Sequence, residues 1–202
     1  MEDPNFWLER WQNNEIGFHS EDVQPALIKH WPVLQIAKSA RVFVPLCGKT
    51  LDMAWLAAAG HVVVGSELSP LAVDTFFAER KLAPQTRSQP PFTIKSMGPY
   101  ELWCGDFFAL RKKEINVSAA YDRAALVAMP PNLQPHYAAK MAELLPAGAK
   151  VLLIGLDYDP KEMQGPPFNV PQARVQEMFG KDFDVSVIDA RDGLTKSEHL
   201  KK

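Results

Sequence analysis

The sequence predicts an α/β fold in which a doubly wound, mostly parallel sheet carries helices on both faces. Short apolar runs rich in β-branched residues recur along the chain, as expected of strands buried on both sides of a parallel sheet. Helical segments alternate with these runs, which is the order of a βαβ protein. The 202 residues, 47% hydrophobic and 23% charged, suffice for a single domain with a substantial core.

The segment 41–67, RVFVPLCGKTLDMAWLAAAGHVVVGSE, contains the clearest βαβ unit. Residues 41–46 predict a buried strand. Thr50 can cap the helix that follows, and Gly60 ends that helix where a left-handed conformation is wanted. A second apolar strand, 61–65, then leads to an acidic residue.

One interpretation of this unit is a nucleoside-binding site. Gly48 follows the first strand, where the missing Cβ lets the backbone approach a ligand. Glu67 comes 19 positions later, close to the spacing of about 20 residues between a nucleotide-binding glycine turn and the acid that binds ribose. The alternative is an ordinary βαβ unit, with Gly48 as a turn residue and Glu67 as a solvated strand end.

The turn itself limits which cofactor fits. It has one glycine of the three in G-x-G-x-x-G, which disfavours a nicotinamide dinucleotide. Gly48-Lys49-Thr50 matches the end of a P-loop, but Phe43 stands where its first glycine belongs, so no phosphate cradle forms. S-adenosylmethionine carries no phosphate, and a turn with a single glycine can serve it.

The remaining elements follow in order. Predicted helices cover 5–17, 22–37, 69–82, 132–145 and 171–179, and predicted strands cover 92–97, 100–104, 117–121, 150–156 and 184–190, the last as a half-exposed edge strand. We interpret 83–91 as a loop. The whole chain, 1–202, is one domain, in which 1–37 forms a helical lid, 38–190 the α/β core and 191–202 a polar tail.

Two groups of side chains have a functional and a structural interpretation. Trp7 and Trp11 lie one helical turn apart, so they either pack in the core or fold over the cofactor end of the sheet. Asp106 and Phe107 follow the strand 100–104, where they either contact an adenine ring or form a solvated aspartate beside a core phenylalanine. Spacing alone does not decide between the functional and the structural interpretation of either pair.

Composition disfavours several partners. The formal net charge of −2 gives no electrostatic footprint for nucleic acid. The two cysteines form neither a disulfide framework nor a zinc pattern, and the five histidines do not cluster, so no metal is assigned. Cys47, near a helix start, has either a lowered pKa or, the favoured interpretation, a packed side chain. No apolar span crosses a membrane, and the acidic start is no signal sequence, which favours a cytoplasmic monomer.

Five short motifs carry a resemblance to a known family. FWLERW and GFH lie near the start, the PLCGK turn follows the first strand, YDRAALVAM begins at the last residue of the strand 117–121, and GPPFNVP begins at Gly165. In this order, across nearly the whole chain, they resemble the thiopurine S-methyltransferase family, a bacterial member in particular. The PLCGK turn replaces the acid-x-Gly-x-Gly-x-Gly turn of most methyltransferases and is a mark of this family.

The resemblance implies a class I, Rossmann-like methyltransferase fold and S-adenosylmethionine as cofactor. It also implies site residues. Cofactor contacts fall on Trp11, Leu46, Gly48, Glu67, Asp106, Phe107 and Arg123. Acceptor contacts fall on Phe18, which lies over the methyl donor, and on Trp7 and Phe168. Arg123 also steers an anionic acceptor, because its guanidinium stays charged.

The implied reaction is in-line transfer of the sulfonium methyl group to an aromatic or heterocyclic thiol, or to selenium or tellurium compounds. Positioning and desolvation, not a strong general base, should supply most of the acceleration. Two alternatives stay open: a non-catalytic nucleoside-binding or sensor protein, and a halide or thiocyanate methyltransferase. A nucleic-acid amino-methyltransferase is disfavoured because Asp122-Arg123 occupies the place of its Asn/Asp-Pro-Pro-Tyr motif.

One expectation concerns the end of the sheet. Sheets of this class finish with an antiparallel pair of strands, and the sequence offers only 184–190 before the polar tail 191–202. The family's last strand, with the acceptor-facing arginine ahead of it, has no match here. The sequence leaves open whether this strand is missing, and a missing strand would leave the sheet with an unpaired edge.

Overall fold

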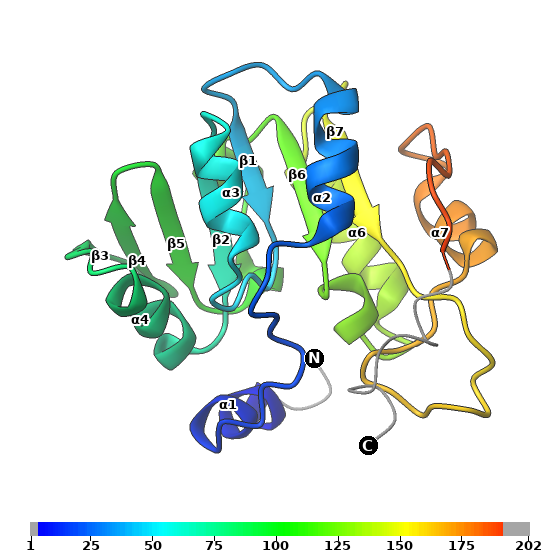
Figure 1. The fold of residues 1–202 in the computed structure, drawn as a ribbon, viewed down its shortest axis with the longest axis horizontal. Helices are drawn as coiled ribbons and strands as arrows, with labels where there is room; N and C mark the ends of the chain where they lie inside the picture. Colours follow the sequence, from blue (N-terminus) through cyan, green and yellow to red (C-terminus); the bar gives the residue numbers. More distant parts are fainter. Residues whose placement is uncertain (1–3, 192–202) are drawn as a thin grey trace.

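A computed structural model describes residues 4–191 and shows one seven-stranded sheet in the order β3-β4-β5-β2-β1-β6-β7 (Figure 1). The strands are β1 (Arg41–Val44), β2 (Val62–Glu67), β3 (Gln85–Gln89), β4 (Phe92–Met97), β5 (Tyr100–Cys104), β6 (Ala119–Arg123) and β7 (Lys150–Ile154). The helices are α1 (Pro4–Gln12), α2 (Pro25–His30), α3 (Asp52–Ala58), α4 (Pro70–Glu79), α5 (Lys112–Ile115), α6 (Gln134–Leu144) and α7 (Gln172–Phe179).

The five strands β5, β2, β1, β6 and β7 run parallel to one another. At the β5 edge, β4 and β3 extend the sheet in antiparallel pairing. In register, Val42 of β1 pairs with Val63 of β2 and with Ala119 of β6. The parallel strands therefore end together, and the loops that follow them meet along one edge, where ligands bind in open α/β sheets.

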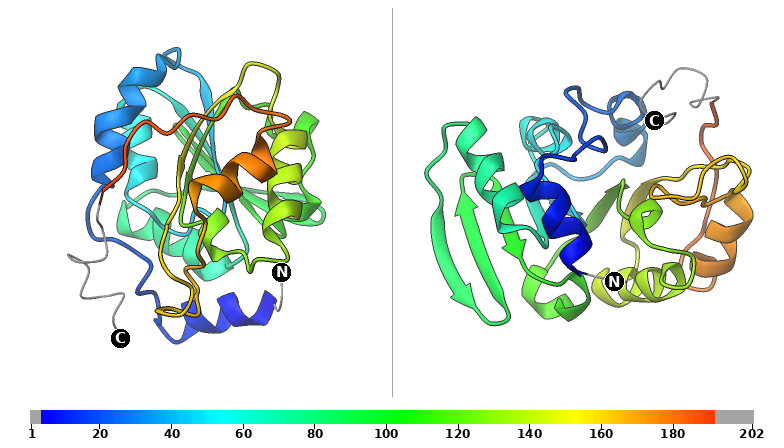
Figure 2. Two further views of the ribbon diagram at one scale, coloured as in Figure 1. Left: turned by 90° about the vertical axis from the view of Figure 1, so that its right-hand side faces the viewer. Right: turned by 90° about the horizontal axis from the view of Figure 1, so that it is seen from below.

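Alternate residues of β1 pack on opposite faces of the sheet. Val42 and Val44 belong to a core cluster with α2, α3 and α4, whereas Phe43 belongs to a second cluster with α5, α6 and α7. The view along the sheet in Figure 2 shows these two helical layers. A strand buried on both sides needs apolar residues at every position, which explains the continuous apolar run in its sequence.

The predicted α/β class, the parallel sheet and most elements are confirmed, with helices shorter than predicted. The predicted helix 22–37 divides into α2 and a 3₁₀ segment, Trp31–Leu34, because Pro32 cannot donate the backbone hydrogen bond that would continue an α-helix. Ser69 caps α4, accepting from the backbone N–H of Ala72 at 3.3 Å. Two further short 3₁₀ segments, Phe107–Ala109 and Leu126–Ala128, were not predicted.

Two strand predictions are wrong. Residues 83–91, taken as a loop, contain β3, whose side chains are mostly exposed and which is held by backbone pairing with β4. Residues 184–190, taken as an edge strand, pair with no strand, although the chain there is extended and coil-like. In the part of the chain that the structure describes, β7 is thus an edge strand with β6 as its one neighbour. The predicted tail beyond Arg191 lies outside the described residues.

Packing of Val185 against the core and charge contacts of Asp189, not sheet pairing, hold the segment 184–190. Asp189 Oδ2 lies 2.8 Å from His30 Nε2, 3.0 Å from Lys29 Nζ and 2.9 Å from Arg191 Nη2. Hydrogen bonds from these three groups, first from His30, lower the pKa of Asp189, so it stays ionised in weak acid.

We expect Asp189→Asn to loosen this segment alone. Loss of the negative charge removes the attraction to α2, so backbone amides of residues 184–190 should exchange with deuterium faster while those of β1 and β6 keep their rates. Hydrogen exchange with mass-spectrometric readout measures this, with Asp182→Asn as the matched control. Unchanged exchange in 184–190 would show that Asp189 does not anchor the segment.

Helix α1 lies beyond the edge of the sheet at which the parallel strands end, and it contacts α4 (Figures 1 and 2). No helix within residues 4–191 is long and apolar enough to span a membrane.

Candidate functional site

The turn after β1 is tied to the neighbouring strand β2. Cys47 donates its backbone N–H to the carbonyl oxygen of Ser66 at 2.9 Å, and the N–H of Leu46 points to Ser66 Oγ at 3.4 Å. Leu46 and Gly48 have φ angles of 46° and 51°. This left-handed backbone suits glycine and strains leucine, so the PLCGK turn is held in an unusual shape by its contacts.

Glu67 holds the same turn from the end of β2. Its Oε2 accepts the backbone N–H of Gly48 at 2.8 Å and its Oε1 accepts that of Ser69 at 2.8 Å. The residue is only 7% exposed. Burial raises the pKa of Glu67, while the hydrogen bonds from Ser69 and Gly48 oppose that rise. The solvated-strand-end interpretation of Glu67 is therefore wrong.

The free acceptor sites of Glu67 fit a ribose. A carboxylate offers about four lone-pair sites, and the two backbone N–H groups occupy one on each oxygen. The remaining sites can accept hydrogen bonds from the two hydroxyl groups of a ribose. The spacing of Gly48 and Glu67 in the sequence thus corresponds to a direct contact in space.

The side chain of Cys47 is packed, which confirms the interpretation favoured from the sequence. It is 5% exposed, and a Cβ added to Gly65 of β2 would lie 2.7 Å from its sulfur. Gly65 therefore makes the room that the Cys47 side chain fills. Burial, followed by the charge of Glu67, raises the pKa of Cys47, so the lowered pKa considered from its position near a helix is wrong.

Aromatic side chains cover the turn. A Cβ added to Gly48 would lie 3.0 Å from Cζ2 of Trp11, so the indole lies directly on the glycine. The ring of Phe18 meets Trp11 edge-on at 5.7 Å and Trp7 at 5.5 Å between centroids. The structure therefore brings Trp7, Trp11 and Phe18 together above Gly48.

Arg123 ends β6, the strand that pairs with β1, and is partly exposed. The loop after it begins with Ala124 at a φ of 61°. Asp122 fixes this loop: its Oδ1 accepts the N–H of Leu126 at 3.2 Å, and its Oδ2 accepts the hydroxyl of Tyr137 at 2.7 Å. Burial raises the pKa of Asp122 to about 6.

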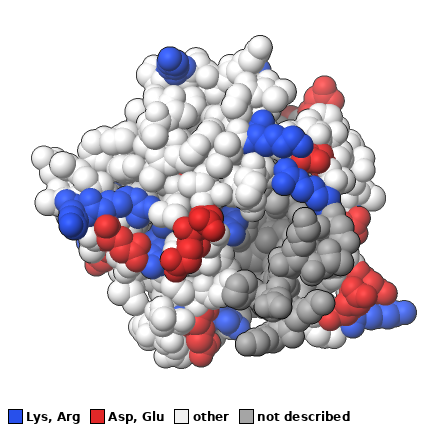
Figure 3. Space-filling model, viewed as in Figure 1, with Lys and Arg blue, Asp and Glu red and all other residues white. Residues whose placement is uncertain are grey.

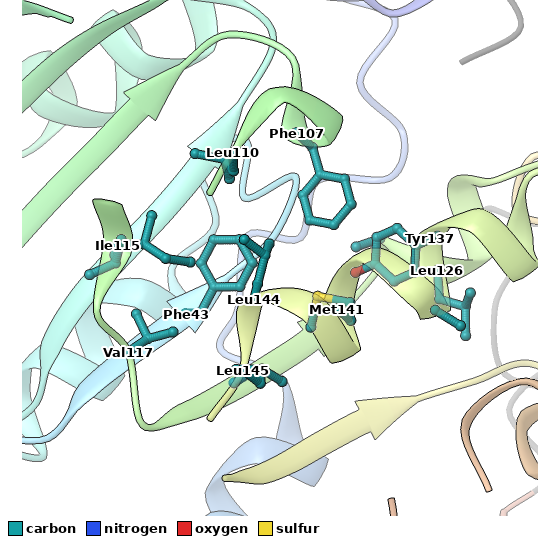
Figure 4. Close-up of a cluster of buried hydrophobic side chains, with 14 of the residues drawn as sticks. Phe43, Phe107, Leu110, Ile115, Val117, Leu126, Tyr137, Met141, Leu144 and Leu145 are labelled. Atoms are coloured by element: carbon teal, nitrogen blue, oxygen red, sulfur yellow. The ribbon is translucent and has the colours of Figure 1, made fainter. Parts of the chain in front are cut away.

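Asp106 and Phe107 follow β5, whose last residue, Cys104, pairs with Glu67. Asp106 is exposed and its Oδ1 accepts the N–H of Phe108 at 3.0 Å. Phe107 points into the core, as Figure 4 shows, stacked between Tyr137 at 5.0 Å and Phe43 at 6.3 Å. The observed geometry is that of the structural interpretation: Asp106 is exposed and Phe107 is a core phenylalanine.

Phe168 lies apart from the other candidate residues. Its backbone N–H donates to the carbonyl oxygen of Val127 at 2.6 Å. The hydroxyl of Tyr158 donates to the carbonyl oxygen of Pro167 at 2.6 Å. Phe168 lines a cavity of about 460 Å³ that none of the other candidate residues lines. Its wall also includes Pro131, Gln134, Tyr158, Met163 and Arg174.

Sequence reasoning missed two buried carboxylates beside the site. Asp122 was treated as a strand end, and Asp52 as part of a helix. Asp52 is 1% exposed and accepts the Tyr121 hydroxyl at 2.9 Å and the N–H of Gln24 at 2.8 Å. It thereby fastens the segment after α1 to the sheet. Across residues 4–191, no group of three His, Cys, Asp or Glu side chains is arranged to hold a metal.

The fold is shared with solved structures of low sequence identity. An S-adenosylmethionine-dependent methyltransferase from Anabaena variabilis superposes with a TM-score of 0.62 at 13% identity, covering 88% of this chain and 80% of that one. A TehB-like S-adenosylmethionine-dependent methyltransferase from Corynebacterium glutamicum gives a TM-score of 0.56 at 13% identity, covering 88% and 81%. The fold, with the glycine turn and the buried acid at its ligand edge, is that of the class I S-adenosylmethionine-dependent methyltransferases.

The sequence specifies the family. The thiopurine S-methyltransferase family pattern matches residues 2–202. The thiopurine S-methyltransferase of Xanthomonas euvesicatoria is 48% identical over 200 residues, covering 98% of this chain and 92% of its own length. That of Pseudomonas fluorescens strain Pf0-1 is 47% identical over 195 residues, covering 96% and 89%. The chain belongs to the thiopurine S-methyltransferase family, and its cofactor is S-adenosylmethionine.

Proposed function

We propose that this enzyme transfers the methyl group of S-adenosylmethionine to the sulfur of aromatic or heterocyclic thiols, and to selenium or tellurium compounds of similar nucleophilicity. One observation carries the proposal: buried Glu67 holds the Gly48 turn directly beneath the aromatic cover of Trp7, Trp11 and Phe18. Apolar rings thus lie over a turn that one buried acid holds, and that acid is positioned for a nucleoside.

The cofactor side of the site follows from these contacts. Glu67 binds the ribose hydroxyls, while Leu46 and Gly48 present backbone to the ligand and Trp11 covers it. Asp106 accepts from the adenine amine, and Phe107 supports that end from the core. Arg123 supplies a positive charge from the end of β6. When bound, the cofactor supplies an activated methyl group on a cationic sulfur.

The acceptor side lies beneath the N-terminal segment that carries α1 and Phe18, whereas α2 packs on the face of the sheet. Phe18 and Trp7 exclude water and favour a cationic sulfur through their ring faces. We assign Phe168 to the outer wall, where the segment 165–168 approaches the loop after β6. Positioning a soft nucleophile in line with the methyl group is the main task asked of these side chains.

The experiment that tests this function uses methyl-labelled S-adenosylmethionine and a panel of acceptors: a thiopurine, thiophenol, selenite, iodide and a short DNA duplex. Label on the thiols or on selenium supports the proposal and ranks the acceptors. Label on iodide alone would indicate a halide methyltransferase. Cofactor binding without transfer to any member would indicate a sensor.

We expect Arg123→Ala to lower kcat/KM for an anionic thiolate by about tenfold, because the variant loses the positive charge that raises the local concentration of anions. Arg123→Lys should retain most of the effect, since the charge remains. Steady-state kinetics with a thiolate and with a neutral acceptor separate steering from general damage. Full retention of kcat/KM in the alanine variant would remove Arg123 from the site.

We further infer a cytoplasmic monomer that does not act on nucleic acid. The net charge of −2 and the basic and acidic side chains that lie side by side on the face in Figure 3 support this view. Sedimentation of the purified protein tests whether it is a monomer. The DNA duplex in the acceptor panel tests whether it acts on nucleic acid.

A further inference from the structure

Asp122 lies at the start of the loop that follows β6, directly before Arg123. Its carboxylate is fully buried, and each of its oxygens accepts one hydrogen bond. Oδ1 accepts the backbone N–H of Leu126 at 3.2 Å, and Oδ2 accepts the hydroxyl of Tyr137 at 2.7 Å. The first bond holds the loop from inside the core, and the second joins it to α6. The carboxylate therefore fixes how the chain leaves the sheet at this point.

The loop has a shape that needs support. Ala124 has a φ of 61°, in the left-handed region that is unfavourable for a residue with a Cβ. The bond from Leu126 to Asp122 spans this residue and closes the turn. Hydrogen bonds to an ionised acceptor are stronger than bonds between neutral groups, so a carboxylate holds the turn better than an amide of the same shape.

Two residues assigned to the acceptor side depend on this loop. Arg123 comes immediately before Ala124, so the turn sets the direction of the backbone that carries the guanidinium group. Phe168 donates its backbone N–H at 2.6 Å to the carbonyl oxygen of Val127, in the 3₁₀ segment at the end of the same loop. A shift of the loop would therefore move both side chains.

The ionised form of Asp122 lowers the stability of the fold. Burial raises the pKa of Asp122 to about 6, whereas the hydrogen bonds from Tyr137 and Leu126 oppose that rise. Near pH 7 the carboxylate is still mostly ionised, and the folded protein holds this charge at a cost. A buried charge that weakens the fold beside a ligand site is typical of a residue that serves the site.

We propose that Asp122, held by Tyr137, is a positioning residue for methyl transfer, and that it fixes the loop 124–128 so that Arg123 and Phe168 keep their places on the acceptor side. The proposal rests on the function proposed above, which assigns those two residues to the acceptor. It predicts an unusual combination in one variant, higher stability together with slower methyl transfer. Damage to the fold would lower both.

The first test measures the stability and the activity of Asp122→Asn near pH 7. The acceptor is 4-nitrothiophenol, which is already a thiolate at this pH. We expect unfolding at a higher urea concentration than in the wild type, and a kcat/KM for the acceptor about tenfold lower. The Kd of S-adenosylmethionine should change less than about threefold, because Glu67 and Gly48 belong to other strands and keep their mutual contact. The exposed Asp184→Asn is the matched control.

The second test removes the partner of Asp122. Tyr137→Phe loses the hydroxyl but keeps the ring, which stacks on Phe107 with centroids 5.0 Å apart (Figure 4). We expect kcat/KM for the same acceptor to fall about fivefold, because the carboxylate loses one of its two anchors. Tyr100→Phe is the matched control. Tyr100 begins β5, at the edge of the sheet away from the ligand loops, and this variant should keep the wild-type rate.

The third test is a double-mutant cycle, which shows whether Asp122 acts through Arg123. An Arg123→Ala protein has no guanidinium group left to misplace. In that background, we expect Asp122→Asn to lower kcat/KM less than about threefold, against about tenfold in the wild type. A buried residue with a purely structural role would give the same loss in both backgrounds.

Three results would overturn the proposal. The first is an Asp122→Asn protein with wild-type kcat/KM. The second is a slower protein that is also less stable, since damage to the fold would then explain the loss. The third is an equal loss in both backgrounds of the cycle. Each of these concerns Asp122 alone, because the wild type still methylates the thiol. A wild-type protein that methylates no acceptor would instead overturn the proposed function, and the positioning role with it.

Discussion

Glu67→Ala should weaken S-adenosylmethionine binding by about 1.5–3 kcal/mol, which is roughly 10- to 150-fold in Kd. The variant loses the charged acceptor for the ribose hydroxyls. It also leaves the N–H groups of Gly48 and Ser69, each now 2.8 Å from a carboxylate oxygen, without their partner. The turn would lose its shape as well as its ligand contact. Isothermal titration calorimetry with cofactor measures the change.

Two controls separate these contributions. Glu67→Gln keeps one acceptor oxygen for the turn but loses the charge, so its affinity should fall between that of the wild type and that of the alanine variant. Glu143→Ala removes an exposed carboxylate on α6 and should bind cofactor normally. A Glu67→Ala protein with wild-type affinity and a native circular dichroism spectrum would remove Glu67 from the cofactor site.

Asp122→Asn should change how stability depends on pH. The pKa of Asp122 is raised by burial from 3.8 to about 6, and each pKa unit corresponds to about 1.4 kcal/mol. Its ionisation in the folded protein therefore costs about 3 kcal/mol. Below about pH 4 both folded and unfolded states are protonated and no cost arises. Between about pH 4 and 6 the unfolded state ionises first, so stability falls as pH rises, and above about pH 6 the cost is complete.

The asparagine variant lacks this ionisation, and its amide oxygen can still accept the N–H of Leu126. Relative to the wild type, it should gain about 2–3 kcal/mol in unfolding free energy between pH 4 and pH 7. Urea unfolding at both pH values measures the difference, with Asp184→Asn, an exposed position, as the control. A difference between the two proteins that is the same at pH 4 and pH 7 would contradict the raised pKa.

Sequence patterns predicted the parts of the fold whose reasons are local. The apolar run at 41–46 and the glycine at position 48 each have a physical cause that is visible within a few residues. By contrast, β3 (QTRSQ) has no apolar alternation, because it is an exposed edge that depends on backbone pairing with β4. The segment 184–190 has the alternation of a strand but is held by packing of Val185 on the core and by ionic contacts of Asp189.

The candidate site was predictable in part for the same reason. The contact between Gly48 and Glu67 follows from a known spacing. The packing of Phe107 between Phe43 and Tyr137 does not, because those rings come from separate elements. Asp122 and Asp52 are ordinary acids in sequence, and only the folded chain shows that each faces a tyrosine hydroxyl in the interior.

The antiparallel strands β3, β4 and β5 follow one another directly in the chain, whereas the parallel strands β1, β2, β6 and β7 are joined to their sheet neighbours through long crossovers. Closing a short turn costs less entropy than bringing distant segments together. We therefore expect the meander to form early in refolding, with β1 joining β2 and β6 later. Ligand-site assembly then belongs to the last stage, because Gly48, Glu67 and Arg123 are brought together only when the central parallel strands pair.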